Sequence, residues 1–335
     1  MAEKKLKSID DIARLAGVSK STVSRALNDS PLVEAGTKER ILAIAKRHEF
    51  RPSSAARNLS LRSSRTIAFV SHSYRKDSCG ISDPFSIEIM GGIARGLHEQ
   101  GYDLLTVQID PDDTDWASQY FDSGKVDGFI LMTSTKKRRH LELLRSRGIP
   151  FIAWGPGGGD YCSVCGDDVK GGRLAAERFL ATGRKRIAHI AGPRTEKEAA
   201  DRRRGFESAL NEAGAELSQG RIAYGDYSKA SGAQAMRELL ARDPSIDAVF
   251  CAGDMMAIAA LGALSAEGRR MPQDVAVIGY DDLDLASYVS PALTTVSQRI
   301  PFAGRLLARD IVAYLGNGIV TTTIVPVELV VRESA

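Results

Sequence analysis

The sequence predicts an α/β protein with two lobes of parallel β-sheet, preceded by a small domain made only of helices. From Thr66 onward, short apolar runs bounded by Gly, Pro or Asp alternate with amphipathic stretches, whereas residues 1–60 contain no strand-like run. Residues 1–65 hold 14 Lys and Arg against 7 Asp and Glu, and the rest of the 335-residue chain holds 31 against 35. The length suits two or three domains. A basic head on a slightly acidic body is typical of a protein that binds a polyanion.

The beginning of the chain predicts two short helices joined by a tight turn. Ser8, with Asp11 three residues later, is typical of a helix N-cap, and a helix to about Ala16 follows. Gly17 provides the turn, and Ser19 caps a second helix that ends near residue 28.

Two more helices and a tether are expected before the body begins. The pattern predicts a third helix over 37–48, with apolar residues on one face. Pro52 precedes a short helical stretch, SSAARNL, at 53–59. Residues 60–65 are polar and basic with no apolar anchor, so we expect them to link head and body.

The body predicts right-handed β-α-β units, because strand-like runs alternate with helices of about 10 to 15 residues. Strands are expected at 66–70, 102–108, 126–132, 150–154, 185–192, 248–253 and 275–280, and helices at about 85–100, 137–147, 169–182, 199–213, 229–242, 254–267 and 301–316. One sheet seldom holds so many strands, so two similar lobes are expected. Ligands bind at the carboxyl ends of such strands, and two lobes facing each other there would form a cleft.

The chain shows little that favours an enzyme. It has no GxSxG elbow and no Walker sequence, and GPGGGD (155–160) lacks the third glycine of a dinucleotide fingerprint. Cys162 and Cys165 form a CxxC without a second pair at zinc spacing, and YCSVCGDD reads better as a buried strand. We expect no catalytic residue, no metal and no cofactor. With no apolar run of signal-peptide or membrane-spanning length, we expect a cytoplasmic protein without a membrane partner.

The first two helices predict a helix-turn-helix, since a tight glycine turn precedes a helix that is polar at its N-terminal end. Such a helix fits the major groove, where its first residues reach base edges. Hydroxyl groups and N-terminal amides suit phosphates, and Lys or Arg can reach guanine O6 and N7. Ala13 is small enough to let the helices cross closely. On these features alone, a three-helix interaction domain stays open as an alternative.

The residues in detail resemble the LacI/GalR family of bacterial transcription regulators over essentially the whole chain. The head carries DIARLAGVSKSTVSRALN (11–28) and RPSSAARNL (51–59). The body carries DPF (83–85), VDGFIL (126–131), DDVKGG (167–172), GRKRIAHIAGP (183–193), RRRGF (202–206), FCAGDMMAIAALG (250–262), MPQDVAVIGYDD (271–282) and PALTTVSQ (291–298). The resemblance implies a periplasmic-binding-protein-like core and a DNA-binding head.

The resemblance also implies which residues of the head touch DNA. Base-reading positions fall on Lys20, Ser21 and Arg25, and positions that orient the helix on the DNA backbone fall on Ser19, Thr22, Ser24 and Asn28. Residues 53–60 resemble the family's hinge helix, which enters the minor groove of the operator. There Leu59 stands at the wedge position, flanked by Ala56 and Arg57; unstacking a base step costs a few kcal/mol, which the bend repays in contacts.

Two hinge helices are needed to wedge both half-sites, so the resemblance implies a homodimer on near-palindromic double-stranded operator DNA. The chain ends at VVRESA without the leucine-heptad tail that some members use to form tetramers. A dimer is therefore the expected assembly.

The effector site is implied by the same resemblance, between the lobes. A sugar needs planar groups that bind its hydroxyls and an aromatic face. Arg202 and Asp281 match the charged anchors and Tyr227 the stacking aromatic, while His72, Phe85 and Gln298 complete the expected lining. Gly253 stands where lactose-type members have Asn, which leaves room for a ligand such as a disaccharide.

These inferences predict a transcriptional repressor of carbohydrate-utilisation genes that a mono- or disaccharide releases from its operator. The alternative is a co-repressor-dependent regulator of the purine type, whose ligand tightens DNA binding. The expected domains are the head (1–51), the hinge and linker (52–65) and the core (66–335), with one lobe at about 66–165 and 298–324 and the other at about 166–295 and 325–335.

Overall fold

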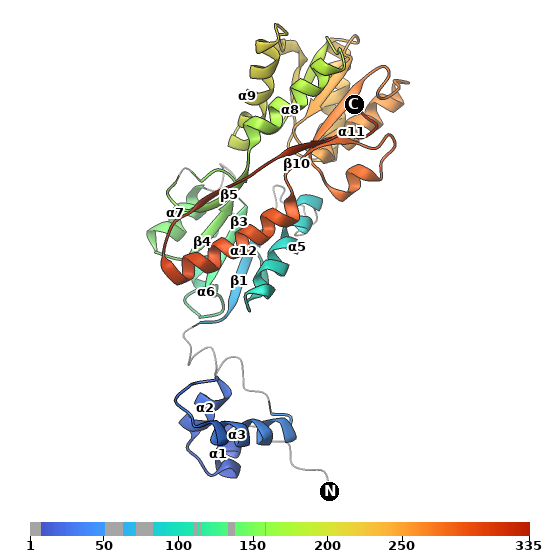
Figure 1. Ribbon diagram of the computed structural model, residues 1–335. Helices are drawn as coiled ribbons and strands as arrows, with labels where there is room; N and C mark the ends of the chain where they lie inside the picture. The colour runs from blue at the N-terminus through green and yellow to red at the C-terminus, as the bar shows by residue number, and fades with distance from the viewer. Residues whose placement is uncertain are drawn as a thin grey trace. The chain divides into compact units, whose positions relative to one another are not determined.

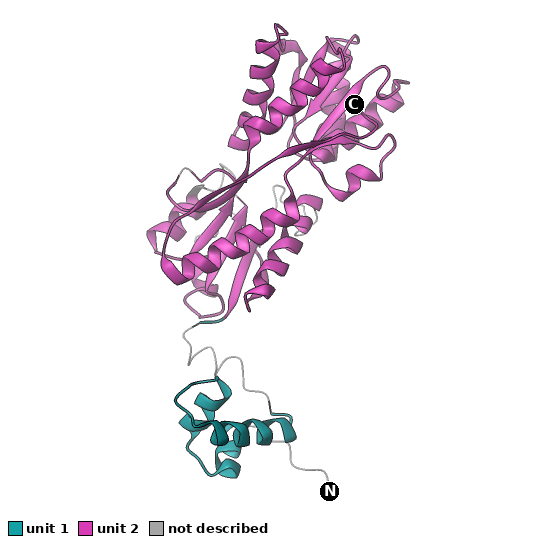
Figure 2. Ribbon diagram, in the orientation of Figure 1, with its two compact units in different colours: residues 1–64 teal, residues 65–335 magenta. Residues whose placement is uncertain are grey.

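The computed structural model describes residues 8–50, 63–71, 83–109, 113, 115–132, 138–157 and 159–335. The chain forms two compact units, residues 1–64 and residues 65–335 (Figure 2). No helix in the described ranges is long and apolar enough to cross a membrane.

The first unit contains three helices, α1 (Ile9–Ala16), α2 (Lys20–Leu27) and α3 (Ala35–Arg47). The caps of the first two agree with the sequence: the side chains of Ser8 and Ser19 accept hydrogen bonds from backbone amides, and Gly17 is left-handed with φ of 63°. The helix α3 begins two residues earlier than expected, because the Glu34 carboxylate accepts hydrogen bonds from the first amides of that helix. All three helices share one small apolar core, formed by Ile12, Ala13, Ala16, Val23, Ala26, Ile41 and Ala45.

The second unit contains two six-stranded sheets, which confirms the predicted fold class. The first sheet has the order β11-β5-β4-β3-β1-β2, and the second has the order β12-β10-β9-β8-β6-β7. The pairs within each sheet are parallel, except that β12 runs antiparallel to β10. The strands are β1 (Thr66–Ser71), β2 (Asp103–Gln108), β3 (Gly128–Met132), β4 (Phe151–Trp154), β5 (Cys162–Gly166), β6 (Ile187–Ala191), β7 (Ile222–Tyr224), β8 (Ala248–Cys251), β9 (Ala276–Asp281), β10 (Thr294–Ser297), β11 (Thr322–Val325) and β12 (Glu328–Val330).

Helices flank both sheets, as Figure 1 shows. They are α5 (Pro84–Glu99), α6 (Trp116–Tyr120), α7 (Arg138–Ser146), α8 (Asp168–Ala181), α9 (Lys197–Glu212), α10 (Lys229–Arg242), α11 (Asp254–Ala266) and α12 (Ile300–Asn317), with short 3₁₀ turns η2 (Gln219–Arg221) and η3 (Asp284–Ser287). The predicted strands and helices of the body are present within a few residues of their expected bounds. The helix predicted at 53–59 lies outside the described residues.

The two sheets divide the second unit into two lobes joined by three crossovers of the chain. Strands β1–β5 and β11 form one sheet and β6–β10 and β12 the other, so the chain passes between lobes after β5, after β10 and between β11 and β12. These crossovers follow Gly166, Ser297 and Val325. Figure 1 shows these chain segments passing between the two halves of the second unit.

Glycine allows one helix pair in each lobe to meet at backbone distance. In the first lobe, a Cβ on Gly92 or Gly304 would overlap the backbone of the facing helix, which joins α5 to α12. In the second lobe, a Cβ on Gly172 or Gly205 would overlap the backbone of Arg202 or Val169, which joins α8 to α9. Such contacts hold each pair at a fixed spacing.

Candidate functional sites

The expected DNA-reading residues lie together on α2. The side chains of Lys20, Ser21 and Arg25 are exposed, and Thr22, Ser24 and Asn28 are half-buried. Val23 and Ala26, on the opposite face, are buried against the head's core. This helix therefore presents its polar face to solvent, as a groove-binding helix must.

Hydroxyl groups at the start of α2 bind one another. Ser19 Oγ accepts a hydrogen bond from the Thr22 amide at 3.2 Å and lies 2.8 Å from both Ser21 Oγ and Thr22 Oγ1. Ser19 thus has a local role as the helix cap, besides any contact it makes with DNA.

Lys20 has a partner outside its own helix. Its Nζ forms an ion pair with the carboxylate of Asp10 on α1, and both side chains remain more than half exposed. The pair links α1 to the face of α2 that is expected to contact DNA. Asp10 was not among the site residues predicted from the sequence.

Four expected site residues cannot be placed: Ala56, Arg57 and Leu59 of the hinge, and His72 after β1, lie outside the described residues.

The expected effector residues of the second lobe lie at one edge of its sheet, where the parallel strands end. Tyr227 follows β7, Gly253 follows β8, Asp281 ends β9 and Gln298 follows β10. Arg202 lies on α9, which follows β6. This is the edge at which open parallel sheets bind ligands.

Arg202 is 5% exposed and is held by protein groups on several sides. Its Nε donates to Asp168 Oδ1 at 2.8 Å, and its Nη1 donates to the carbonyl of Ala252 at 2.6 Å. The guanidinium also lies over the ring of Tyr280 at 3.8 Å, and the hydroxyl of that tyrosine donates to Asp168 Oδ1 at 3.1 Å. The position of Arg202 is therefore fixed within the protein.

Asp281 and Gln298 form a pair across the sheet edge. Gln298 Nε2 donates to Asp281 Oδ1 at 2.7 Å. Burial raises the pKa of Asp281 to about 7, against the opposing effects of Arg202 and of the Gln298 hydrogen bond. The other amide atom, Gln298 Oε1, is buried and has no hydrogen-bond partner among the described residues.

Tyr227 lies against the same group. A Cβ on Gly253 would be 3.2 Å from Tyr227 Cδ1 and 3.5 Å from Asp281 Oδ2, so this glycine separates ring and carboxylate. The Tyr227 hydroxyl is buried and, within the described ranges, has no hydrogen-bond partner. The backbone of Tyr227 is left-handed with φ of 66°, a conformation that non-glycine residues adopt at a cost.

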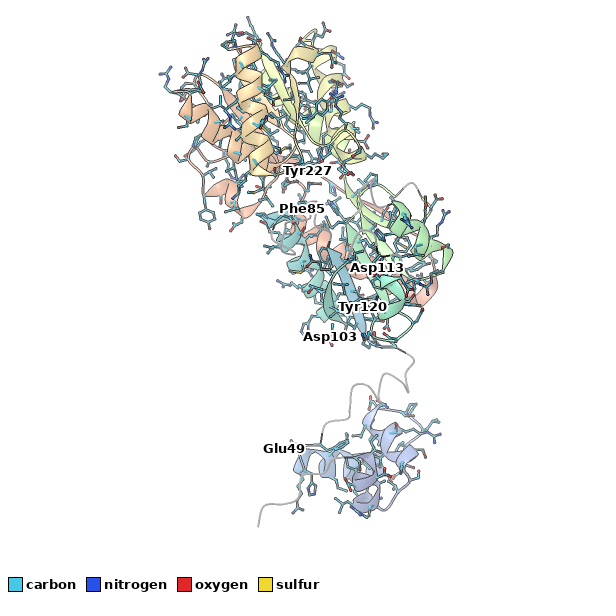
Figure 3. All side chains as sticks on the ribbon, turned by 180° about the vertical axis from the view of Figure 1, so that it is seen from behind. Glu49, Phe85, Asp103, Asp113, Tyr120 and Tyr227 are labelled. Carbon is cyan, nitrogen blue, oxygen red and sulfur yellow. The ribbon has the colours of Figure 1, made fainter. Side chains whose placement is uncertain are left out.

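Phe85 belongs to an aromatic pair on the other lobe. It lies in the first turn of α5, with its ring centroid 5.9 Å from that of Trp154 at the end of β4. Leu283 and Met255 of the second lobe pack in the same apolar cluster. Figure 3 shows Phe85 at the edge of the first lobe and Tyr227 at the edge of the second, facing the junction of the two.

Three acidic residues of this region were missed by the sequence interpretation. Asp168 binds Arg202. Glu198 lies one helical turn before Arg202, and burial raises its pKa to about 7. Asp254 is fully buried, where its carboxylate accepts hydrogen bonds from Thr295 Oγ1 and from the amide of Leu283, and burial beside Asp281 raises its pKa well above the usual value. In a helix, a spacing of four places Glu198 and Arg202 on the same face, so the sequence held a usable signal for Glu198. The contacts of Asp168 and Asp254 join residues far apart in the sequence, which no local pattern predicts.

The CxxC pair lies on a strand, as expected from YCSVCGDD. Cys162 is buried and Cys165 half-buried on β5, and both thiols are free. Burial, with the nearby carboxylate of Asp168, raises the pKa of Cys165 to about 11, which disfavours the reactive thiolate.

Comparison with known proteins matches both parts of the chain. Residues 8–53 match the family described as bacterial regulatory proteins, lacI family, and residues 176–335 match a periplasmic binding protein-like domain. The HTH-type transcriptional regulator CelR of Thermobifida fusca is 35% identical over 339 residues, covering 99% of this chain and 97% of that protein. The HTH-type transcriptional repressor PurR of Mannheimia succiniciproducens is 32% identical, covering 87% and 86%. Among solved structures, a CelR–cellobiose complex is 33% identical, with a TM-score of 0.75 over 98% of this chain and 100% of that one.

Proposed function

Because this chain belongs to the lacI family of bacterial regulatory proteins, we propose that it represses carbohydrate-utilisation genes until a saccharide releases it from its operator. It is a DNA-binding transcriptional regulator and not an enzyme. Since its target is chromosomal DNA, it would act in the cytoplasm.

The DNA-binding half of the proposal rests on the polar face of α2. Lys20, Ser21 and Arg25 are exposed on one helix that begins at a hydroxyl-rich cap. A helix of this kind enters the major groove with its first turn, so Lys20 and Ser21 would meet base edges and Arg25 a guanine one turn later. Ser19, Thr22, Ser24 and Asn28 would contact the DNA backbone, and Leu59, with Ala56 and Arg57, would enter the minor groove.

The effector half rests on one observation: at the same sheet edge, two buried polar atoms lack hydrogen-bond partners among the residues that the structure describes. Buried hydroxyls and amides are almost always hydrogen-bonded, so such atoms at a ligand-binding edge point to bonds that a ligand or a water molecule completes. Tyr227 Oη and Gln298 Oε1 are both of this kind, and the carboxylate of Asp281 lies between their side chains. A saccharide supplies hydroxyl groups for both atoms and an apolar ring face for Tyr227 or for the Phe85–Trp154 pair.

We propose cellobiose or a similar disaccharide as the effector. The support is the likeness to the CelR–cellobiose complex over nearly the whole chain, together with Gly253, which leaves the space between Tyr227 and Asp281 free of a larger side chain. The second candidate is a purine co-repressor, favoured by the 32% identity to a PurR repressor.

A homodimer is part of the proposal, since a palindromic operator requires two heads. The structure offers an apolar face for the partner: Ile87 on α5 is 49% exposed, and Leu285 and Tyr288 at η3 are 42% and 77% exposed. These elements are joined, because Glu88 Oε1 accepts a hydrogen bond from the amide of Asp284. Sedimentation velocity should show a dimer that Tyr288→Glu weakens and Ile324→Glu, on the exposed edge of the first sheet, leaves intact.

The direction of the ligand's effect tests the proposal. An operator is first selected from random duplexes with the purified protein, and its affinity is then measured with mono- and disaccharides and with purines that raise the melting temperature. Cellobiose is expected to lower operator affinity about 5- to 150-fold, the usual range of such coupling. If no sugar changes operator affinity while a purine increases it, the co-repressor alternative is correct.

A further inference from the structure

We propose that Asp168 makes the effector site selective for uncharged ligands, by keeping the positive charge of Arg202 neutralised inside the protein. The inference rests on the proposed effector site and assigns to it a chemical class, neutral polyhydroxyl compounds rather than sugar phosphates, uronates or aldonates. Asp168 is thereby a specificity-determining residue.

The first support is the geometry of the pair. The side chains of Asp168 and Arg202 are 7% and 6% exposed, and their Nε–Oδ1 distance is 2.8 Å. Away from water such a pair interacts strongly, and separating it leaves a buried charge without a partner. A ligand carboxylate or phosphate must therefore either displace Asp168 or bind the remaining N–H groups of a guanidinium whose charge is already paired.

The second support is that the pair is held from both sides. Asp168 is the first residue of α8, and α8 meets α9 at the Gly172 contact with the backbone of Arg202 itself. The Tyr280 hydroxyl donates to the same Asp168 oxygen, and its ring covers the guanidinium. Arg202 also donates to the Ala252 carbonyl. Neither partner can turn away without disturbing these contacts.

The third support is the charge balance around the pair. Arg202 is the only buried Lys or Arg in the parts of the chain that the structure describes, whereas Asp168 and Asp254 are buried acids of the same lobe. Asp201, a third buried acid of this lobe, is instead paired with Lys197 and Arg204 on α9. An anionic ligand would thus meet, among the described residues, no buried cation whose charge is not already paired, which disfavours such a competitor.

For a neutral ligand, two other carboxyl groups of this region can serve as hydrogen-bond partners. Asp281 and Glu198 have pKa values raised by burial to about 7, so each can accept or donate a hydrogen bond near neutral pH. Hydroxyl groups match such partners because they also donate and accept.

The inference is tested with saccharide pairs in which a carboxylate replaces one hydroxymethyl group and every ring is kept, cellobiose with cellobiouronate and glucose with glucuronate. Binding to the full-length protein is measured by calorimetry at pH 7.5 and constant ionic strength. In the wild type, the neutral member should bind at least tenfold more tightly than its anionic partner. In Asp168→Asn, which keeps an oxygen for Arg202 but removes the charge, that ratio should fall at least tenfold.

The matched control is Asp201→Asn, which removes a neighbouring buried carboxylate that binds Lys197 and Arg204 instead; its ratio should equal that of the wild type. An anionic member that binds the wild type as tightly as its neutral partner overturns the inference, and so does an unchanged ratio in Asp168→Asn.

A second measurement needs no saccharide. It uses the melting temperature, so it also shows whether Asp168→Asn is folded. Sulfate should raise the melting temperature of Asp168→Asn by several degrees more than that of the wild type, at matched ionic strength in chloride. Asp168→Asn/Arg202→Gln has no buried charge at this pair and should fold, but without the sulfate effect. If Asp168→Asn shows no sulfate effect, or the double variant retains it, Arg202 is not the neutralised cation and the inference is wrong.

These outcomes separate the two proposals. If the wild type binds no saccharide while sulfate stabilises Asp168→Asn alone, the carbohydrate effector is wrong and the role of Asp168 stands. If saccharides bind without regard to charge, the carbohydrate effector stands and the role of Asp168 is wrong.

Discussion

The polar face of α2 and the cluster around Arg202 are built in opposite ways. On α2 the reading side chains are exposed, and their contacts are made within the helix or with the adjacent α1. Around Arg202 the side chains are buried, and the contacts join residues 34, 50 and 112 positions apart. Residues of the first kind can change one at a time and alter only what is recognised. Residues of the second kind hold the fold and the site together, so a change there affects both.

The largest expected effect concerns Arg202. Arg202→Gln leaves Asp168 as a buried charge without its ion-pair partner, which should lower the free energy of unfolding of the core by about 3–5 kcal/mol. Trp116 and Trp154 both lie in the second unit, so tryptophan fluorescence during urea unfolding reports on that unit alone. Arg204 is an exposed partner of Asp201 on the same helix, and Asp201 keeps Lys197 when Arg204 is changed, so Arg204→Gln should cost less than about 1 kcal/mol. Equal losses of unfolding free energy in Arg202→Gln and Arg204→Gln would contradict the distinction between buried and exposed side chains.

The next effect is a loss of folding stability at low pH, which we expect in the core and not in the head. His189 is fully buried, and burial lowers its pKa to about 4, below the value of about 6.5 expected in the unfolded chain. Below pH 6.5 the unfolded state therefore binds more protons, and the core should lose up to about 3 kcal/mol of stability as the pH falls toward 4.

His189→Gln isolates this contribution. The raised pKa values of Asp281 and Glu198 act in the opposite direction, because the folded state takes up their protons first as the pH falls. The difference between wild type and variant, measured by urea unfolding at pH 7.5, 6 and 5, should grow in the variant's favour as the pH falls. A constant difference would mean that His189 is not held neutral. In residues 8–50 no titratable side chain is buried, so the head should lack this response.

The third effect is on recognition without stability. Arg25→Ala should cost about 1–3 kcal/mol of operator binding and relax specificity at one base pair, because Arg25 is exposed and its loss would remove the proposed base contact. The core's unfolding curve should not change. Arg47→Ala removes the same charge from the last turn of α3 and should at most weaken binding uniformly across sequences. An unchanged operator preference in Arg25→Ala would show that α2 is not placed in the groove as proposed.

The smallest effect concerns Asp10, the acidic partner of Lys20. Asp10→Asn frees the Lys20 ammonium and removes a negative charge near the DNA, so affinity should rise a few-fold for operator and unrelated DNA alike, since an exposed pair is worth under about 1 kcal/mol. Titrations at several salt concentrations measure this. Glu49→Gln is the charge-matched control, since Glu49 lies at the far end of α3 (Figure 3). The same rise in both variants would assign the effect to net charge rather than to Lys20.

The sequence predicted best the features that depend on neighbouring residues. The caps Ser8 and Ser19, the turn at Gly17 and the amphipathic helices of the body all follow from local patterns. The strands β7, β10, β11 and β12 were not predicted, because runs of three or four residues carry too little periodicity and are defined by their partners. The cluster of Arg202, Tyr227, Asp281 and Gln298 came from the family resemblance. The Asp168 and Ala252 contacts that hold Arg202 depend on tertiary packing, which no local pattern contains.

The glycine contacts between α5 and α12 and between α8 and α9 have a mechanical consequence. With backbones touching at Gly92 and Gly304, and again at Gly172 and Gly205, neither helix pair can slide without a collision. These contacts therefore stiffen each lobe, and the lobes are joined at the crossovers after Gly166, Ser297 and Val325. Gly166 and Gln298 lie at two of these crossovers and are close to each other: a Cβ on the glycine would lie 2.7 Å from Gln298 Oε1. A molecule bound to this amide would therefore contact the chain directly at the place where the two lobes are joined.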